Sequence, residues 1–321
     1  MIDSNLYDEV REKIAEYKSI TILTHLNPDA DTLGTALGIY ALLIRDKSKR
    51  VEVISASVDM PINLDFLPNH KKIKHKMDYS NSLVISCDCG SIDRLGFNLD
   101  SRDIINIDHH LSNTNYGNIN VIKSNYASAS QVAFELFREL YDINSDSAIC
   151  FYSALLSDTR YFTTSSMNNE IFKVAQELVE LGANPYKIAR NFTQRRSLSS
   201  LRILEKVLGS LRLYKSAKVA TIIASMDDIS SSGATNADID GIVDYAKSLI
   251  TVEIAIFVIE TNSGVRVSMR SKGLDISKVA VAFGGGGHRV ASGFSLEKCG
   301  LKETIDTILI KIEELGLIHE I

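Results

Sequence analysis

The amino-acid sequence predicts an α/β protein: a parallel-sheet domain with helices on both faces, then a helical connector and a smaller α/β domain. Two observations lead to this prediction. A chain of 321 residues exceeds the usual size of a single domain, which is about 150 residues. Short β-rich runs also alternate with helical patterns through the first half, an order typical of parallel strands flanked by helices.

Composition places the chain among folded globular proteins. Apolar residues make up 45% and charged residues 23% of the chain, without low-complexity tracts. The net charge of −5 argues against binding a long nucleic-acid duplex through many phosphates, although local charges can still hold a short anion. No stretch approaches about 18 uninterrupted apolar residues, and residues 1–18 have the pattern of an amphipathic helix rather than a signal peptide. We therefore expect a cytoplasmic protein with no membrane partner.

Four β-rich runs in the first half are the predicted strands. They cover residues 19–25, 49–56, 82–88 and 103–110. Apolar residues at helical spacing predict helices over residues 32–46, 128–140, 147–159 and 169–182. Because helical crossovers keep neighbouring strands parallel, the carboxyl ends of these strands should meet at one edge.

The second half begins after a basic helical stretch with few strand signals, which is the predicted connector. Further β-rich runs cover residues 216–225, 248–260 and 264–271, and a helical pattern closes the chain over residues 302–315. The predicted boundaries are 1–190 for the first domain, 191–213 for the connector and 214–321 for the second domain.

Acidic and imidazole side chains stand where the predicted strands end. Since open α/β folds place their ligands at the carboxyl ends of their strands, we expect these side chains to converge. Asp31 could also cap the helix predicted to begin near Thr32. The converging residues are His25, Asp29, Asp31, Asp88, Asp108, His109, His110 and Asp158.

So many carboxylates at close range repel one another, and a divalent cation is the simplest way to balance them. Mixed carboxylate and imidazole ligands favour Mn²⁺, with Mg²⁺, Fe²⁺ and Co²⁺ as alternatives. The ligands suffice for two ions about 3.5 to 4 Å apart, the spacing used in two-metal phosphoryl chemistry. The sequence therefore predicts a site for two divalent metal ions.

The motifs that carry these residues resemble those of the DHH phosphoesterase family. In order they are "THLNPDADTLGTALG", "CDCGSIDRLG", "IDHH" and "SDTRYF". Farther along, "MRSKG" and "FGGGGHRVASGF" are similar to the DHH-associated substrate domain of that family. The resemblance spans nearly the whole chain, and it implies a DHH catalytic domain followed by a substrate-binding domain.

A two-domain chain of this size most resembles the nano-RNase group of the family. The resemblance implies a hydrolase that cuts RNA or DNA oligonucleotides of about two to five nucleotides to mononucleotides. It also implies dephosphorylation of 3'-phosphoadenosine 5'-phosphate (pAp) to AMP, and it allows a homodimer. The alternatives are a linear or cyclic dinucleotide phosphodiesterase, a pAp-only phosphatase, a single-strand DNA exonuclease or, from another class, a nucleotide sensor without turnover.

The resemblance also assigns a role to each residue of the constellation. His110 would face the scissile phosphate, and Asp108 would orient the imidazoles from behind. One metal ion is assigned to His25, Asp29 and Asp88. The other is assigned to Asp31, Asp88, His109 and Asp158, with Asp158 considered as a bridge between both ions.

The run "GGGGH" is the predicted clamp for the part of the substrate remote from the reaction. Residues without Cβ let backbone amides approach a phosphate closely, and an arginine fork can grip a phosphate in two places. The clamp consists of Arg270, Gly285, Gly286, Gly287 and His288. Facing the metal site across a cleft, such a clamp would favour short strands.

Two positions depart from the family pattern. Ala30 stands in "PDAD", and Arg160 follows "DT", where family members usually or often have glycine. The methyl group of Ala30 changes the turn but not the ligands. Arg160 either contacts a substrate phosphate or forms a surface ion pair, and the sequence leaves both open.

Overall fold

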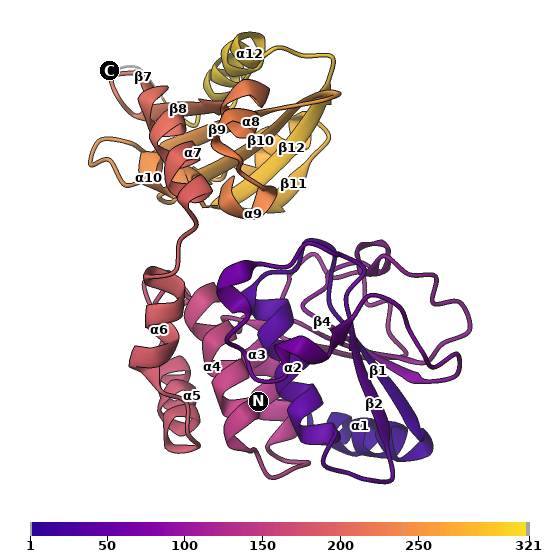
Figure 1. The fold of residues 1–321 in the computed structure, drawn as a ribbon. Coiled ribbons are helices and arrows are strands. Elements are labelled where there is room, and N and C mark those ends of the chain that lie inside the picture. The colour runs from indigo at the N-terminus through magenta and orange to yellow at the C-terminus, as the bar shows by residue number, and fades with distance from the viewer. Residues whose placement is uncertain (1, 240, 319–321) are drawn as a thin grey trace. The chain divides into compact units, whose positions relative to one another are not determined.

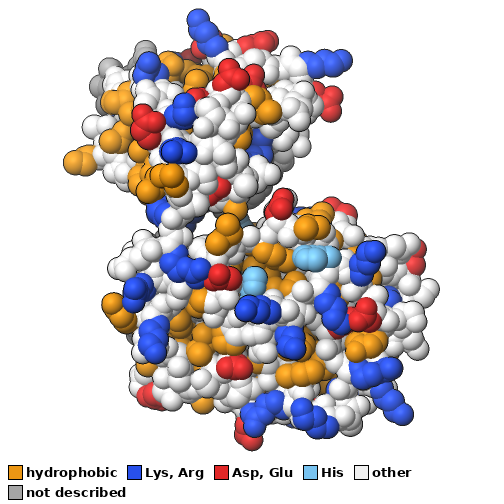
Figure 2. Space-filling view, viewed as in Figure 1, with side chains coloured by type: hydrophobic (Ala, Val, Ile, Leu, Met, Phe, Trp, Pro, Cys, Tyr) orange, Lys and Arg blue, Asp and Glu red, His pale blue; other side chains and the backbone are white. Residues whose placement is uncertain are grey.

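The structure is a computed structural model that describes residues 2–239 and 241–318. Its contacts divide the chain into one unit of Met1–Arg195 and another of Arg196–Ile321, and each is described by itself (Figure 1). The connector and boundaries at 190 and 213 remain predictions. Among the described residues, no helix is both long and apolar enough to cross a membrane. Lys and Arg side chains are interspersed with Asp and Glu on the visible face of each unit (Figure 2).

The first unit contains a six-stranded parallel sheet with the order β3-β2-β1-β4-β5-β6. Four of its strands confirm the predicted ones, namely β1 (Ser19–Leu23), β2 (Arg50–Ile54), β4 (Leu83–Cys87) and β5 (Ile104–Asp108). The edge strands β3 (Ile73–Lys74) and β6 (Ile119–Ile122) were not predicted. Both are short and only partly buried, so they lack the continuous apolar run that marks the central strands.

The helices expected in this unit are present, namely α1 (Ser4–Glu16), α2 (Ala30–Leu43), α3 (Ala129–Phe137), α4 (Ser145–Asp158) and α5 (Asn169–Glu180). A further helix, α6 (Pro185–Thr193), was not predicted as a separate element. Figure 1 shows α2, α3 and α4 beside one another, in mutual contact. Gly34 lets α2 approach α4 closely, because a Cβ there would lie 2.6 Å from the carbonyl oxygen of Cys150. This contact packs α2, whose first residues belong to the acidic motif, against α4, which ends in Asp158.

The two faces of the sheet are covered differently. On one face, side chains such as Ile22, Ile85 and Ile107 share a core with residues of α1 to α4. On the opposite face, Leu23, Val84 and Ile104 pack with the short 3-10 helix η3 (Ile92–Leu95) and with loop residues. The predicted α/β class is confirmed, with α-helices on one face and a 3-10 helix on the other.

The second unit is the predicted smaller α/β domain, and its sheet is mixed. The strand order is β11-β12-β10-β9-β8-β7, in which β8 and β9 are parallel and the other pairs are antiparallel. The strands are β7 (Arg212–Tyr214), β8 (Val219–Ala224), β9 (Ile254–Thr261), β10 (Gly264–Ser271), β11 (Gly286–His288) and β12 (Ala291–Glu297). The helices are α7 (Leu198–Gly209), α8 (Met226–Ser232), α9 (Asn236–Ile239), α10 (Val243–Lys247), α11 (Ser277–Ala282) and α12 (Leu301–Glu314).

Candidate metal centre

The eight residues of the acidic and histidine constellation all lie in the first unit. His25 follows β1, Asp88 follows β4, and Asp108 ends β5, so the strands deliver them to the carboxyl edge of the sheet. Asp29 and Asp31 lie at the start of α2, and Asp158 is the last residue of α4. The structure thus brings together side chains that are far apart in the sequence.

Three overlapping groups of these side chains could hold a metal ion. Within each group, the ligand atoms lie within 4.8 Å of one another. The groups are His25, Asp29 and Asp88; Asp31, His109 and Asp158; and Asp88, His109 and His110. Asp88 links the groups: its Oδ2 lies 3.6 Å from His25 Nε2 and its Oδ1 lies 3.5 Å from His109 Nε2. Asp88 falls in two of the groups, whereas Asp158, the residue considered as a bridge, falls in only one.

Asp88 has the features of a carboxylate placed for a cation. Its backbone has a φ of 56°, a left-handed conformation that is uncommon outside glycine and that is often found at functional sites. The residue is 3% exposed, and its Oδ1 has no hydrogen-bond partner among the described residues. Burial raises the pKa of Asp88 well above its usual range, and the nearby Asp31 carboxylate raises it further. A divalent cation fits this site because it would compensate the buried charge.

Two of the histidines are held with Nε2 toward the carboxylates. His25 Nδ1 lies 2.9 Å from the carbonyl oxygen of Leu26, and His109 Nδ1 lies 3.2 Å from that of Tyr126. Because a carbonyl only accepts, Nδ1 carries the hydrogen in both rings and donates it. Nε2 is then the nitrogen with a lone pair for a metal ion.

His110 is held differently, by a carboxylate. Its Nδ1 lies 2.7 Å from Oδ1 of Asp108, which is fully buried. Burial raises the pKa of Asp108, but hydrogen bonds with His110 and Asn113 outweigh burial and leave that pKa below its ordinary value. The Asp108 carboxylate accepts the hydrogen of Nδ1 and so fixes the orientation of the His110 ring, an arrangement that suits a proton donor.

The start of α2 corrects one expectation from the sequence. Asp29, and not Asp31, caps the helix: its Oδ1 accepts hydrogen bonds from the amides of Asp31 at 3.0 Å and Thr32 at 3.1 Å. The helix begins at Ala30, two residues earlier than predicted, so the Asp31 side chain is no longer at the capping position. Asp31 instead accepts hydrogen bonds from the first amides of α3, those of Ala129 at 2.7 Å and Ser130 at 3.1 Å. These hydrogen bonds hold the Asp31 carboxylate against the start of α3.

Arg160 lies in an unusual turn directly after Asp158. Arg160, Tyr161 and Phe162 have φ values of 47°, 59° and 63°, so three successive residues are left-handed. Glycine tolerates this conformation best, so the left-handed backbone here would suit glycine at the position of Arg160. Burial raises the pKa of Asp158 and the Arg160 charge acts against this rise, so the two side chains interact electrostatically.

The predicted clamp residues lie in the second unit. Arg270 on β10 and His288 on β11 are both paired with Ala291 of β12, one from each side. Residues in one such row project from the same face of a sheet, and two strand spacings separate them by about 10 Å. The small side chain of Ala291 lies between the arginine and the histidine.

The three glycines of the clamp have different structural explanations. A Cβ on Gly285 would collide with the carbonyl oxygen of Gly293, and Gly287 has a φ of 136°. Close packing and backbone conformation in the β11–β12 hairpin therefore require these two glycines. A Cβ on Gly286 would meet no heavy atom within 4 Å. The close approach of a ligand was expected to explain the whole run, and Gly286 is the clamp glycine that neither packing nor a positive φ explains.

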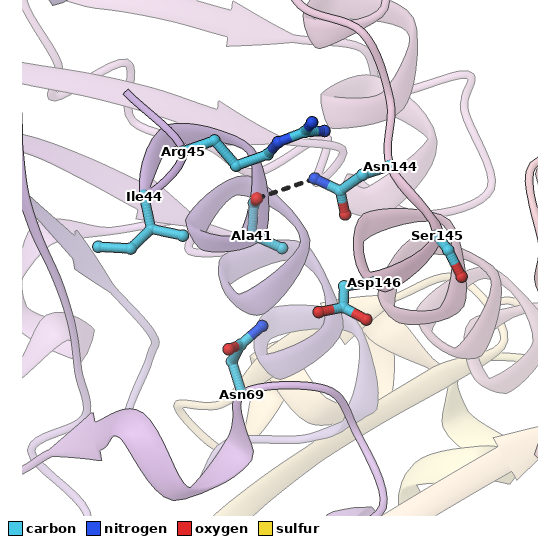
Figure 3. A pocket seen from close by; sticks show the side chains of 7 residues that line it. All are labelled: Ala41, Ile44, Arg45, Asn69, Asn144, Ser145 and Asp146. Carbon is cyan, nitrogen blue, oxygen red and sulfur yellow. Dashed lines mark hydrogen bonds between the residues drawn. The ribbon is translucent and has the colours of Figure 1, made fainter. Parts of the chain in front are cut away.

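A cavity of about 420 Å³ lies at the other end of α2 and α4. Figure 3 shows its lining, in which the side-chain amide of Asn144 donates a hydrogen bond to the carbonyl oxygen of Ala41 at 2.9 Å. The cavity contains none of the predicted site residues. Its lining residues are Ala41, Ile44, Arg45, Asn69, Asn144, Ser145 and Asp146.

Sequence reasoning missed one residue of the constellation. The side-chain amide of Asn113 donates a hydrogen bond to Oδ2 of Asp108 at 2.5 Å. The only signal in the sequence is the position of this asparagine three residues after His110, which is also typical of an ordinary turn. The carbonyls of Leu26 and Tyr126 have no sequence signal, because any residue supplies a carbonyl.

Comparison with known proteins agrees with this arrangement. Residues 19–155 match the DHH family, N-terminal domain, and residues 213–315 match the DHHA1 domain. The chain belongs to the DHH family. The resemblance inferred from the four motifs and the glycine-rich segment is therefore confirmed, and so is the assignment of the chain to the phosphoesterases.

Relatives of this DHH family member match along most of their length. A probable bifunctional oligoribonuclease and PAP phosphatase NrnA from Streptococcus mutans is 27% identical, over 89% of this chain and 92% of that protein. The bifunctional oligoribonuclease and PAP phosphatase NrnA of Bacillus subtilis is 25% identical, over 97% and 99%. The crystal structure of an exopolyphosphatase-related protein from Bacteroides fragilis has a TM-score of 0.89 at 26% identity, covering 98% of each chain.

Proposed function

We propose that this DHH phosphoesterase hydrolyses short oligonucleotides to mononucleotides and dephosphorylates pAp to AMP. The observation that carries the proposal is the convergence of carboxylates and imidazoles around Asp88 at the edge of a DHH-domain sheet. Relatives named for these two activities match along most of this chain and of their own length.

The proposed cofactor is a pair of divalent metal ions, with Mn²⁺ favoured and Mg²⁺ or Co²⁺ as alternatives. Such a pair neutralises phosphate charge and lowers the pKa of a water molecule enough for it to attack near neutral pH. The nitrogen and oxygen donors suit a first-row divalent metal. One ion is proposed for His25, Asp29 and Asp88, and the other for Asp31, Asp88, His109 and Asp158.

The proposed role of His110 is to donate a proton to the leaving oxygen. Its hydrogen bond to the buried Asp108 carboxylate fixes the ring through Nδ1, so Nε2 is the nitrogen that can exchange a proton with substrate. A general acid of this kind contributes about 10²- to 10⁴-fold to the rate.

Substrate binding is proposed for the second unit. Arg270 and His288 project from one face of the sheet, and Gly286 offers open backbone beside them. An arginine beside exposed backbone amides suits a phosphate, because both groups donate hydrogen bonds to its oxygens. In the first unit, Arg160 is proposed to contact a phosphate close to Asp158. Arg160→Ala should then raise KM for pAp without changing kcat.

A substrate panel tests the proposed function directly. The purified chain with Mn²⁺ should release AMP from pAp and mononucleotides from RNA and DNA dinucleotides, and it should act more slowly on a long single strand. Cyclic dinucleotides test the phosphodiesterase alternative, and inorganic polyphosphate tests the activity suggested by the name of the Bacteroides fragilis relative. Asp88→Asn is the matched control, because it removes one charge without changing shape. Binding of these nucleotides without turnover would reject the enzyme in favour of a sensor.

Two further expectations belong to this proposal. Sedimentation of the purified chain tests the homodimer, which predicts about twice the mass of one chain. Fractionation of cells that produce the chain tests the cytoplasmic location. Recovery with the membrane fraction after a salt wash would contradict it.

A further inference from the structure

The side chains of Asn106, Asn113 and Asn120 form a hydrogen-bonded group next to Asp108. We propose that Asn113 is a positioning residue: it fixes the Asp108 carboxylate and, through it, the ring of His110. This inference rests on the proposed role of His110 as proton donor. It adds a residue that neither the metal ligands nor the predicted clamp includes.

The amide group of Asn113 has all of its hydrogen-bonding positions used. Its Nδ2 donates to Oδ2 of Asp108 at 2.5 Å and to the carbonyl oxygen of Cys89 at 3.1 Å. Its Oδ1 accepts from Nδ2 of Asn106 at 3.0 Å and from the amide of Asn115 at 2.7 Å. A flipped amide would place an oxygen against two acceptors, so the network permits a single orientation.

This orientation determines where the Asp108 carboxylate points. With Oδ2 held by Asn113, Oδ1 accepts from the amide of His109 at 2.8 Å and from Nδ1 of His110 at 2.7 Å. The amide of His109 is fixed by the backbone, so Asn113 is the side chain that prevents the carboxylate from rotating away from His110. The ring of His110 is itself 25% exposed, so this hydrogen bond helps to fix its position, together with the ring of His109 at a centroid distance of 4.8 Å.

Asn113 also joins the two loops that carry the site. The carbonyl it contacts belongs to Cys89, the neighbour of Asp88, and the adjacent amide of Thr114 donates to the carbonyl oxygen of Gly90 at 2.9 Å. One side chain thus relates the position of His110 to that of the proposed metal bridge. A proton donor must keep this relation to within a fraction of an ångström.

Asn120 provides a matched control in the same network. Its Oδ1 accepts from Asn106 at 3.3 Å, and its Nδ2 donates to the carbonyl oxygen of Gly117 at 2.7 Å. Like Asn113, it loses donors when it is changed to aspartate. Its hydrogen bonds are with Asn106 and with loop backbone, whereas those of Asn113 include Asp108.

The test compares Asn113→Asp with Asn120→Asp. We expect Asn113→Asp to lower kcat for pAp by about 10- to 100-fold, the usual effect of losing an orienting partner. KM and the affinity for Mn²⁺ should stay within about twofold of wild type, because the metal ligands keep their own hydrogen bonds. Asn120→Asp should keep the wild-type kcat. Equal losses of kcat in both variants, or a loss of Mn²⁺ binding in Asn113→Asp, would overturn the proposal.

A double variant separates positioning from general damage. In a His110→Ala background, Asn113→Asp should lower kcat by less than about twofold, because the group it positions is already absent. A further loss as large as that in the wild-type background would overturn the proposal.

If the wild-type chain hydrolyses none of the substrates, the proposed function is rejected, but the positioning role of Asn113 is not yet tested. A measurement that needs no turnover tests that role separately. Nitrogen NMR of His110 in the Mg²⁺ form should show the hydrogen on Nδ1 in wild type and in Asn120→Asp. In Asn113→Asp, or in Asn113→Ser if the aspartate variant does not fold, this preference should be lost. Retention of the same Nδ1–H signal in the Asn113 variant would overturn the role of Asn113 whatever the substrate is.

Discussion

The acidic edge of the first unit and the glycine-rich hairpin of the second position their functional groups in different ways. At the edge, Asp88 and Asp108 are almost fully buried, and the histidines are fixed by hydrogen bonds to backbone carbonyls or to a carboxylate. In the hairpin, Gly286, Gly287 and His288 are all exposed, and glycine backbone determines the shape. The groups proposed for chemistry are thus held in place by buried contacts, while the hairpin groups proposed for binding lie open to solvent.

The largest effect should come from the centre of the acidic edge. Asp88→Asn keeps the shape of the side chain but removes the charge proposed to bridge the metal ions. Since metal ions contribute several kcal/mol to catalysis, kcat/KM for pAp should fall by about 10³-fold or more. Steady-state assays at saturating Mn²⁺ check this. A loss smaller than about tenfold would contradict the central place of Asp88.

A smaller effect, confined to binding, should come from Arg270 on β10, the strand next to the hairpin. Arg270→Ala removes a charged hydrogen-bond donor and should raise KM by about 10- to 100-fold with little change in kcat. Arg270→Lys, which keeps the charge but not the fork, should recover part of the affinity. If kcat fell while KM stayed constant, the division between binding groups in the second unit and chemical groups in the first would be wrong.

Two adjacent glycines can sharpen the account of the hairpin. Gly285→Ala would create a backbone collision and should lower the free energy of unfolding by about 1 to 3 kcal/mol. Gly286→Ala points into open space and should leave stability within about 0.5 kcal/mol of wild type, while weakening substrate binding if a phosphate contacts this backbone. Urea unfolding and KM measurements on both variants test the contrast. Equal destabilisation would contradict it.

The pH dependence of the free energy of unfolding tests how strongly the acidic edge of the first sheet depends on a bound cation. Burial and neighbouring carboxylates raise the pKa of Asp88 in the folded chain, so the protonated form is favoured there. The metal-free chain should therefore lose stability as pH rises from the ordinary aspartate pKa, about 3.9, through the raised value. Urea unfolding in EDTA at about pH 5 and about pH 8 measures this loss. Added Mn²⁺ should reverse it at the higher pH, and Asp88→Asn should reduce it.

The sequence predicted the acidic edge well because one rule of topology determines it. Parallel strands end at a common edge, so His25, Asp88 and His109 converge whatever the details of the loops. Helical and strand periodicity likewise predicted the central elements, where burial is continuous.

The remaining features depend on contacts between distant segments. Asp31 was misjudged as a cap because its actual partners, the amides of Ala129 and Ser130, lie about a hundred positions away along the chain. The role of Gly285 is likewise decided by the carbonyl of Gly293 on the neighbouring strand. In the sequence, Asn113 has the position of an ordinary turn residue, and its hydrogen bond to Asp108 is evident only in the structure.

Mn²⁺ binding to the metal-free chain tests the central claim most directly. Calorimetric titration should find two ions per chain, with one lost in His25→Ala and the other in His109→Ala, because each histidine belongs to a different ligand group around Asp88. Asp88→Asn should weaken both sites. A wild-type chain that binds no ion, or an Asp88→Asn variant that binds two ions as tightly as wild type, would contradict the claim that Asp88 joins two metal sites.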